Sequence, residues 1–322
     1  MNHLTDCDSI LVNNHPTNKI KHIMKNLTNQ ILAAVNEVVL GKEAQVKLSL
    51  ACIIARGHLL IEDQPGMGKT TLAHTLATVL GLKYQRVQFT SDLLPADILG
   101  VSVYDRNSAS FKFHHGAVFT NVLLADEINR ATPKTQSALL EVMEEAQVTI
   151  DGNTYPLPQP FFVIATQNPV QHIGTFPLPE SQLDRFLMRI SLGYPDHASE
   201  RALLKNQGGR AIAGQIKAVC DARTLIGLQH VASKIHVSDG LLDYLQALVE
   251  YTRSHFATGL SPRSSLGLLQ CARAWAMCEG RDFVIPEDIK TVLPSVVGHR
   301  LQSSGNTHVA QQILDSIAIP KL

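Results

Sequence analysis

A glycine-rich turn from Asp63 to Thr71 contains the residue types that bind phosphate. It follows the apolar run Leu59–Ile61 and precedes the helix-like stretch Leu72–Leu80, so a strand, a loop and a helix are expected in that order. Glycines let backbone N–H groups approach phosphate oxygens, and a helix start offers unpaired amides and a positive dipole end. The turn therefore predicts a nucleoside triphosphate site formed by Pro65, Gly66, Met67, Gly68, Lys69, Thr70 and Thr71.

Three positions of this turn have individual interpretations. Lys69 is expected to reach the β- and γ-phosphates, and the Thr70 hydroxyl to ligate Mg²⁺. Asp63 stands where the pattern G-x-x-x-x-G-K-[ST] has its first glycine. Because Asp tolerates unusual backbone angles better than most residues, we expect the loop to turn there all the same.

A second group of candidate residues is the acidic pair at the end of the apolar run from Asn121. Asp126 is expected to hold Mg²⁺ through its water shell, and Glu127 to orient and polarise the water that attacks the γ-phosphate. Taken alone, the pair is equally well explained as a solvated strand end. Together with the phosphate loop, it favours hydrolysis over phosphoryl transfer to a metabolite.

A third candidate lies at the polar tip of the apolar run Phe161–Ala165. Asn168 could hydrogen-bond both the γ-phosphate and the attacking water. An Asn before a Pro is by itself more often a simple turn residue, so this interpretation depends on the surrounding pattern.

Strands and helices alternate around these residues, which predicts an α/β fold with a parallel sheet buried on both faces. The expected strands are His58–Ile61, Tyr84–Phe89, Val122–Ala125, Phe161–Ala165 and Leu187–Leu192. Two hairpins are expected to project from the sheet, formed by Val101–Tyr104 with Phe111–Phe113 and by Gln147–Ile150 with Thr154–Tyr155.

After Tyr194–Asp196 the strand patterns stop and amphipathic helices follow. We expect them at Ala198–Lys205, Ala222–Lys234, Asp239–His255, Pro262–Cys278 and Pro286–Leu293. Three segments result: a flexible leader over residues 1–25, a nucleotide-binding α/β domain over 26–195 and a helical lid over 196–322.

Composition limits the possible functions of this 322-residue chain. Lys plus Arg and Asp plus Glu number 28 each, so no basic field argues for nucleic acid or an anionic membrane. The five cysteines are scattered and have no C-x-x-C spacing, which fits reduced thiols and a cytoplasmic location. No apolar stretch is long enough to insert into a membrane.

The motifs together resemble the MoxR branch of AAA+ ATPases. The resemblance rests on the phosphate loop and on three further segments, 125–141, 165–169 and 178–186, and extends from about Val38 to Arg300. It implies a P-loop AAA+ core with two hairpin insertions and an all-α lid. It also implies a ring of identical chains, usually a hexamer, with ATP and Mg²⁺ at the subunit interfaces.

Several further site residues follow from the resemblance alone. Arg185 corresponds to the arginine finger that completes a neighbour's site, with Arg189 as the alternative. Arg263 corresponds to the sensor-2 arginine, which reaches from the lid to the bound phosphates. Gly41 lies in the loop on the adenine side, although a plain helix boundary explains it equally well. Independently of the family, Arg263 opposes the positive dipole end of its helix, so an anion is expected to compensate it.

The resemblance implies a chaperone-like factor that remodels or matures protein clients, often with a partner that contains a von Willebrand A domain. A magnesium-chelatase-like ATPase subunit and a nucleotide-dependent scaffold with little turnover remain alternatives. A bacterial enhancer-binding activator fits poorly, because residues 105–110 of the first hairpin lack the G-A-F-T-G-A loop of that class. Neither the client nor the ring size follows from the sequence.

Overall fold

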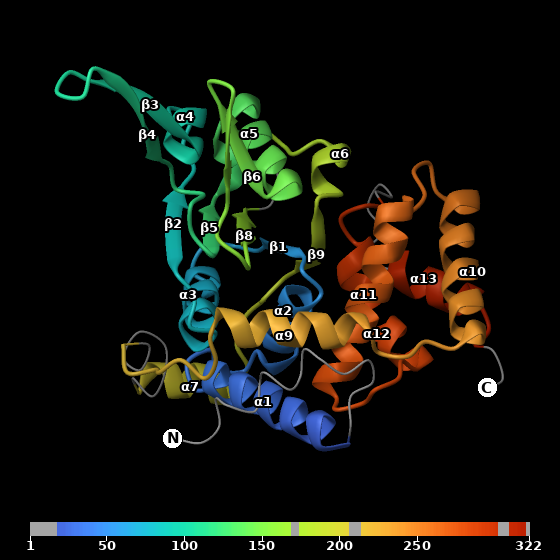
Figure 1. Cartoon of the computed structure of the whole chain (residues 1–322). Helices are drawn as coiled ribbons and strands as arrows, with labels where there is room; N and C mark the ends of the chain where they lie inside the picture. The colour runs from blue at the N-terminus through green and yellow to red at the C-terminus, as the bar shows by residue number, and fades with distance from the viewer. Residues whose placement is uncertain (1–17, 169–173, 206–213, 302–308, 320–322) are drawn as a thin grey trace.

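The computed structural model describes residues 18–168, 174–205, 214–301 and 309–319. A sheet of five parallel strands forms its centre, and the predicted α/β fold is confirmed (Figure 1). The spatial order of the strands is β2 (Tyr84–Gln88), β5 (Val122–Asp126), β8 (Phe162–Gln167), β1 (His58–Glu62) and β9 (Phe186–Ile190). Each strand coincides with a predicted one, apart from small differences at the ends. Because all five strands are parallel, their carboxyl ends lie along one edge of the sheet.

Successive side chains of the strands enter two different apolar clusters, one on each face. Leu59 and Ile61 belong to the cluster that includes α1 (Asn18–Asn36), α2 (Glu43–Ile54) and α3 (Lys69–Val79). Leu60 belongs to the other cluster, with α4 (Pro95–Leu99) and α5 (Pro133–Glu145). Burial on both faces explains why the central strands are continuously apolar.

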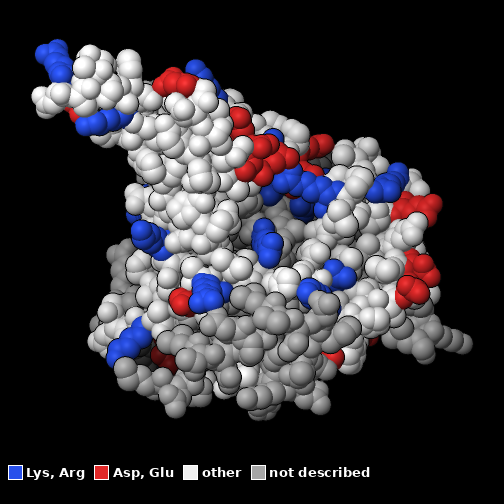
Figure 2. Space-filling view, in the orientation of Figure 1, with Lys and Arg blue, Asp and Glu red and all other residues white. Residues whose placement is uncertain are grey.

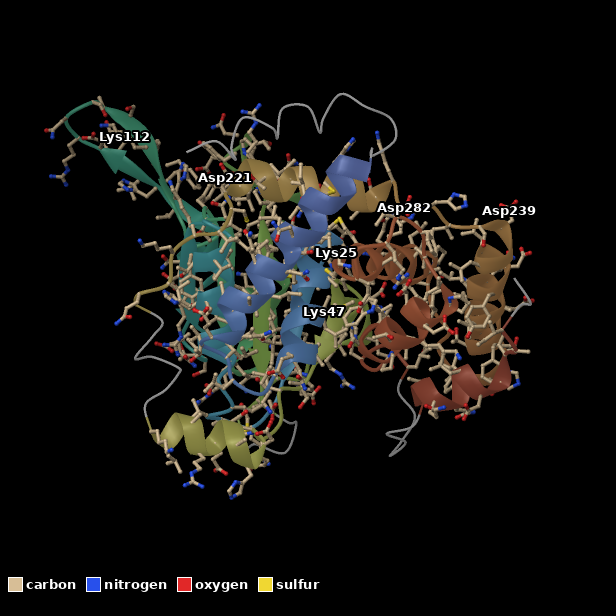
Figure 3. All side chains as sticks on the ribbon, turned by 90° about the horizontal axis from the view of Figure 1, so that it is seen from below. Lys25, Lys47, Lys112, Asp221, Asp239 and Asp282 are labelled. Atoms are coloured by element: carbon tan, nitrogen blue, oxygen red, sulfur yellow. The ribbon has the colours of Figure 1, made fainter. Side chains whose placement is uncertain are left out.

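Helix α1 occupies part of the segment that was expected to be a leader. It begins at Asn18, so Lys25 lies within a helix, and residues 1–17 of the expected leader lie outside the described residues. Lys25 packs closely on the turn after α11 (Pro262–Cys278), where a Cβ added at Gly280 would lie 2.3 Å from the Lys25 Cδ atom. Seen from below, α1 runs across α2 (Figure 3).

Both predicted hairpins are present. The first consists of β3 (Gly100–Asp105) and β4 (Ser110–His115), the second of β6 (Gln147–Ile150) and β7 (Asn153–Pro156). The first hairpin projects from the molecule and carries Lys112 (Figures 1 and 3). The two hairpins touch where the Phe113 ring stacks on the Tyr155 ring, with centroids 4.2 Å apart.

The chain after the sheet is helical, as predicted. It contains α7 (His197–Leu204), α9 (Ala222–Ser233), α10 (Asp239–His255), α11, α12 (Pro286–Val297) and α13 (Val309–Ser316). Helix α11 begins as expected, with the Ser261 side chain accepting a hydrogen bond from the Ser264 N–H and with Pro262 in the first turn. Helix α13 was not predicted, and α12 extends four residues beyond the predicted Leu293.

Arg300, a buried residue that follows α12, connects the helical region to the sheet. Its Nε atom donates to Asp184 Oδ1 at 2.7 Å, and its Nη2 atom donates to the Phe186 carbonyl at 2.8 Å. Asp184 also accepts hydrogen bonds from Ser264 Oγ at 2.6 Å and Ser261 Oγ at 3.1 Å. The start of β9 and the start of α11 are therefore fixed relative to one another.

The described part of the chain contains no helix that is both long and apolar enough to cross a bilayer. Four cysteines fall within it, and all four are free thiols, as predicted: Cys52, Cys220, Cys271 and Cys278. Cys7 lies outside the described residues.

Candidate functional site

The predicted site residues that follow β1, β5 and β8 come together at the carboxyl edge of the sheet. Lys69, the first residue of α3, lies between them. Its Nζ atom donates to the Asp63 carbonyl at 2.5 Å and to Asn168 Oδ1 at 3.0 Å. Asn168 Nδ2 in turn donates to Glu127 Oε1 at 3.3 Å. One chain of contacts therefore joins the phosphate loop, the acidic pair and the polar tip.

The glycines of the loop form an open cradle. Gly66 and Gly68 have φ angles of 87° and 88°, a region that favours glycine, and a Cβ at either position would meet no atom within 4 Å. Gly68 is also the N-cap of α3 and supplies no side-chain cap, so the first amides of the helix keep their capacity to bind an anion. The predicted loop geometry suits a phosphate group.

Asp63 has a function that the sequence did not reveal. Its backbone is not left-handed, so the loop does not turn there as a glycine would. Its carboxylate instead accepts hydrogen bonds from the Gly193 N–H at 2.6 Å and from Ser191 Oγ at 3.0 Å. Burial raises the pKa of Asp63, but these bonds and one from the Gln64 N–H hold the pKa below its ordinary value. The carboxylate thus ties the phosphate loop to the segment between β9 and α7.

Lys69 is largely buried, with 8 % of its surface exposed. Burial lowers the pKa of its ammonium group, while the carboxylates of Asp63, Asp126 and Glu127 act in the opposite direction. A desolvated cation of this kind attracts phosphate more strongly than an exposed lysine would.

The two acidic residues have different surroundings. Asp126 is buried, and its Oδ2 atom accepts from Arg86 Nη2 at 2.6 Å while Oδ1 accepts from Thr166 Oγ1 at 2.5 Å. Glu127 has a φ angle of 55°, and its Oε2 atom accepts from Gln88 Nε2 at 2.9 Å and from Arg130 Nη1 at 3.0 Å.

From the sequence, no role was assigned to these four contact residues: Arg86, Gln88, Arg130 and Thr166. Arg86 and Gln88 alternate along β2, which pairs with β5 in the register Gln88↔Asp126. The alternation is visible in the sequence, but the identity of the neighbouring strand is not.

The donor set agrees with the predicted Mg²⁺. Magnesium commonly binds through one or two carboxylates together with substrate phosphates and water, so Asp126, at the end of β5, is of a chemically suitable type. The Thr70 hydroxyl as a further ligand remains a prediction. A dedicated protein cage is not needed. Within the described residues, no group of three or more His, Cys, Asp or Glu side chains could hold a metal by itself.

Gly41 lies against the start of α7. Its φ angle is 67°, and a Cβ there would lie 2.4 Å from Ser199 Oγ, so the close approach requires glycine. Beside it, the Lys42 ammonium donates to the Tyr194 carbonyl at 2.5 Å. These contacts explain the glycine structurally, and its place on the adenine side remains a prediction.

A cavity of about 550 Å³ borders the loop at Glu62–Gln64. Its other walls are residues of α2, of β9 with the residue that follows it, and of α12: Ala44, Gln45, Leu48, Arg189, Ile190, Ser191, Pro294 and Ser295. Arg189 is engaged within the chain, since its Nη1 atom lies 2.8 Å from Glu62 Oε2 and its Nη2 atom donates to the Gly298 carbonyl at 2.5 Å.

Arg185 and Arg263 lie away from this site. Arg185 precedes β9, whereas the phosphate loop follows the parallel strand β1, so the two are at opposite edges of the sheet. A five-residue strand separates these edges by about 15 Å. Arg263 lies with Arg185, because both guanidinium groups pair with Glu144, at 3.1 and 2.9 Å. Among the described residues Arg263 therefore pairs with Glu144 and not with the phosphate loop of its own chain, and its contact with bound phosphates remains a prediction. The anion that compensates Arg263 is Glu144, a residue that the sequence analysis did not single out.

The chain is similar to known ATPases in sequence and in structure. Residues 58–188 match the family described as "ATPase family associated with various cellular activities (AAA)", and residues 250–317 match the AAA lid domain. The chain is 40 % identical over 307 residues to "Chaperone MoxR1" of Mycobacterium tuberculosis, which covers 89 % of this chain and 81 % of that protein. It is 33 % identical over 295 residues to "Protein MoxR" of Paracoccus denitrificans, covering 84 % of this chain and 86 % of that protein.

Similar structures agree with these matches. The crystal structure of a putative ATPase from Cytophaga hutchinsonii superposes with a TM-score of 0.84 at 36 % identity, covering 94 % of this chain and 97 % of that one. A full-length MCM homolog from Methanopyrus kandleri gives a TM-score of 0.59 at 18 % identity over 89 % of this chain and 63 % of that one, a likeness of fold alone.

Proposed function

The chain belongs to the MoxR family of AAA+ ATPases, and from this premise we propose that it hydrolyses ATP with Mg²⁺ at the interfaces of a homo-oligomeric ring and thereby remodels protein clients. The observation that carries the proposal is the continuous set of contacts from Lys69 through Asn168 to Glu127. It supports a common site for phosphate binding and for positioning the attacking water.

Each residue of this set has a proposed task. The loop amides and Lys69 bind the β- and γ-phosphates, and Thr70 and Asp126 hold Mg²⁺, which neutralises phosphate charge when it is bound. Glu127 orients the attacking water and accepts its proton. Asn168, which lies between Lys69 and Glu127, keeps the phosphate and the water in line. Gly41 and the residues around it are proposed to border the base.

The positions of Arg185 and Arg263 support the assembly of several copies of the chain into a ring. Arg185 and Arg263 are too far from the phosphate loop of their own chain, so we propose that both serve the nucleotide of a neighbouring copy. An arginine supplied in this way contributes about 10³–10⁵-fold to turnover in related phosphoryl transfer. A ring, with six copies as the expected number, gives every nucleotide such a neighbour.

We propose protein clients because of the hairpins and the relatives. The first hairpin exposes Val103, Tyr104 and Phe111, and through the Phe113–Tyr155 stack it contacts the second hairpin. Apolar groups on a projecting element suit contact with polypeptide. A relative named as a chaperone supports the same role, and a partner with a von Willebrand A domain remains a prediction.

Phosphate release measured across a range of protein concentrations tests the proposal. The rate per chain should rise as rings form, and Arg185→Ala should retain ATP binding while losing turnover. Arg189→Ala tests the alternative assignment of the finger: if Arg185 is the finger, this variant should keep more turnover than Arg185→Ala, because Arg189 pairs with Glu62 within the chain. Full activity of a dilute monomer would exclude the shared site, and ATP binding without turnover under all conditions would favour the scaffold alternative.

A further inference from the structure

A single carboxylate joins the two arginines that are proposed to act on a neighbour. Glu144 Oε2 lies 2.9 Å from Arg185 Nη2, and Glu144 Oε1 lies 3.1 Å from Arg263 Nη1. Arg185 also donates to the Leu140 carbonyl of α5. Figure 2 shows acidic groups beside basic ones on the surface between α5 and α11.

These charges are not placed to stabilise their own helices. Glu144 lies in the last turn of α5, where the dipole disfavours an anion, and Arg263 lies in the first turn of α11, where the dipole disfavours a cation. Each charge is instead compensated by the other. The stability of the two helices therefore does not explain why Glu144 and Arg263 stand at these positions.

Hydrogen bonds between residues adjacent to Arg185 and Arg263 hold the backbones of the two arginines at a fixed distance from one another. Asp184, the neighbour of Arg185 in the chain, accepts hydrogen bonds from Ser261 and Ser264, which flank Arg263. Two guanidinium groups held in this way present several N–H donors to one anion with two or more oxygens. A carboxylate satisfies that requirement, and so does a terminal phosphate, which carries more charge.

The three side chains are accessible to a neighbour. The exposed fractions of their side chains are 43 % for Glu144, 47 % for Arg263 and 27 % for Arg185. Partly exposed ion pairs of this kind are weak enough to exchange partners.

We propose that Glu144 is a positioning residue of the shared site. In the unassembled chain its carboxylate binds both Arg185 and Arg263. When the ring forms, both arginines leave Glu144 and bind the triphosphate of the adjoining copy. The inference rests on the proposed function. Assembly then exchanges one anion for another, and the strength of the Glu144 pairs opposes ring formation.

Glu144→Gln tests this exchange. The variant removes the charge that competes with phosphate, so the protein concentration at half-maximal ATPase rate should fall by about tenfold relative to wild type, given two weak pairs. Glu141→Gln is the matched control: Glu141 is exposed on the same helix and makes no ion pair among the described residues. It should leave the midpoint within about twofold of wild type, as surface substitutions generally have small effects.

A second variant covers the case in which Glu144→Gln does not fold. Glu144→Asp keeps the charge, but its shorter side chain cannot span both arginines, so the midpoint should shift in the same direction by a smaller amount. Sedimentation velocity at matched concentrations should show the same order of ring formation. A purely structural role would lower the melting temperature without lowering the midpoint.

An unchanged or higher midpoint in a folded Glu144 variant would overturn the inference. That result is distinguishable from failure of the proposed function, in which the wild-type rate would not depend on protein concentration and Arg185→Ala would remain active.

Discussion

The Lys69 ammonium lies 3.0 Å from the side-chain oxygen of Asn168, although 99 positions separate the two residues in the chain. The parallel sheet produces this contact, because β1 and β8 are neighbours and both end at the same edge. The same Asn168 side chain donates to Glu127, so its amide oxygen contacts the lysine that is proposed to bind phosphate, and its amide nitrogen contacts the proposed base.

Glu127→Gln should abolish turnover and preserve ATP binding. Glutamine keeps the size and an acceptor oxygen for Asn168 but cannot accept a proton, so the ATPase rate should fall by about 10²–10⁴-fold. Phosphate release and calorimetric binding of ATP measure the two properties separately. Glu145→Gln, on an exposed residue of α5, is the control.

The variant also serves to identify the client. A Glu127→Gln ring that holds ATP without hydrolysis should retain its client and partner in a pull-down, while Lys69→Ala, which should not bind ATP, should release them. Wild-type turnover in Glu127→Gln would remove this residue from the mechanism.

Asp63→Gly should loosen the phosphate loop, even though it restores the commoner motif. The change removes the acceptor for Gly193 and Ser191, and the lost hydrogen bonds should lower the free energy of unfolding by about 1–3 kcal/mol. Denaturant unfolding at pH 7 measures the loss. Asp63→Asn keeps one acceptor oxygen and should lose less, whereas equal stability of Asp63→Gly and wild type would show that the contact carries no energy.

Local motifs predicted the parts of the site that lie within single segments. Three features depend only on residues that are close in sequence, so local sequence patterns predict them: the loop around Lys69, the strand end at Asp126 and the N-cap of α11. The contact of Arg86 with Asp126 depends on β2 lying next to β5, and that of Glu144 with Arg263 depends on how α11 docks against α5. Such pairings follow from strand order and domain packing, which a single sequence does not specify.

Asp184→Asn should destabilise the junction between the helices and the sheet. It leaves the buried guanidinium of Arg300 without its carboxylate, which should cost about 3 kcal/mol in the free energy of unfolding. Burial raises the pKa of Asp184, but hydrogen bonds from Ser264 and Arg300 hold it below the ordinary value. Its stabilisation is therefore present above about pH 4 and is lost as the pH falls through the lowered pKa.

The difference between wild type and Asp184→Asn should accordingly be full at pH 7 and shrink below about pH 4. Asp239→Asn, on an exposed residue at the start of α10, controls for the loss of one surface charge. A difference that stays constant down to pH 2 would show that the charge of Asp184 is not what stabilises the junction.

His58 should make the fold sensitive to mild acid. It is buried at the start of β1, where Nδ1 accepts from the Val163 N–H at 2.9 Å and Nε2 lies 3.0 Å from the Met143 carbonyl. Burial lowers the pKa of His58 to about 4. Between pH 6.5 and 4 the unfolded chain binds a proton here that the folded chain does not. The free energy of unfolding should therefore decrease by up to about 3 kcal/mol as the pH is lowered through this range. Buried His299, whose pKa is also lowered by burial, adds to the effect.

The variant His58→Gln tests this effect. Its free energy of unfolding should depend less steeply on pH between pH 6.5 and 4 than that of the wild type. His197→Gln, at an exposed position, is the control and should keep the wild-type slope. Equal slopes in wild type and His58→Gln would show that the folded protein accommodates the charged imidazole.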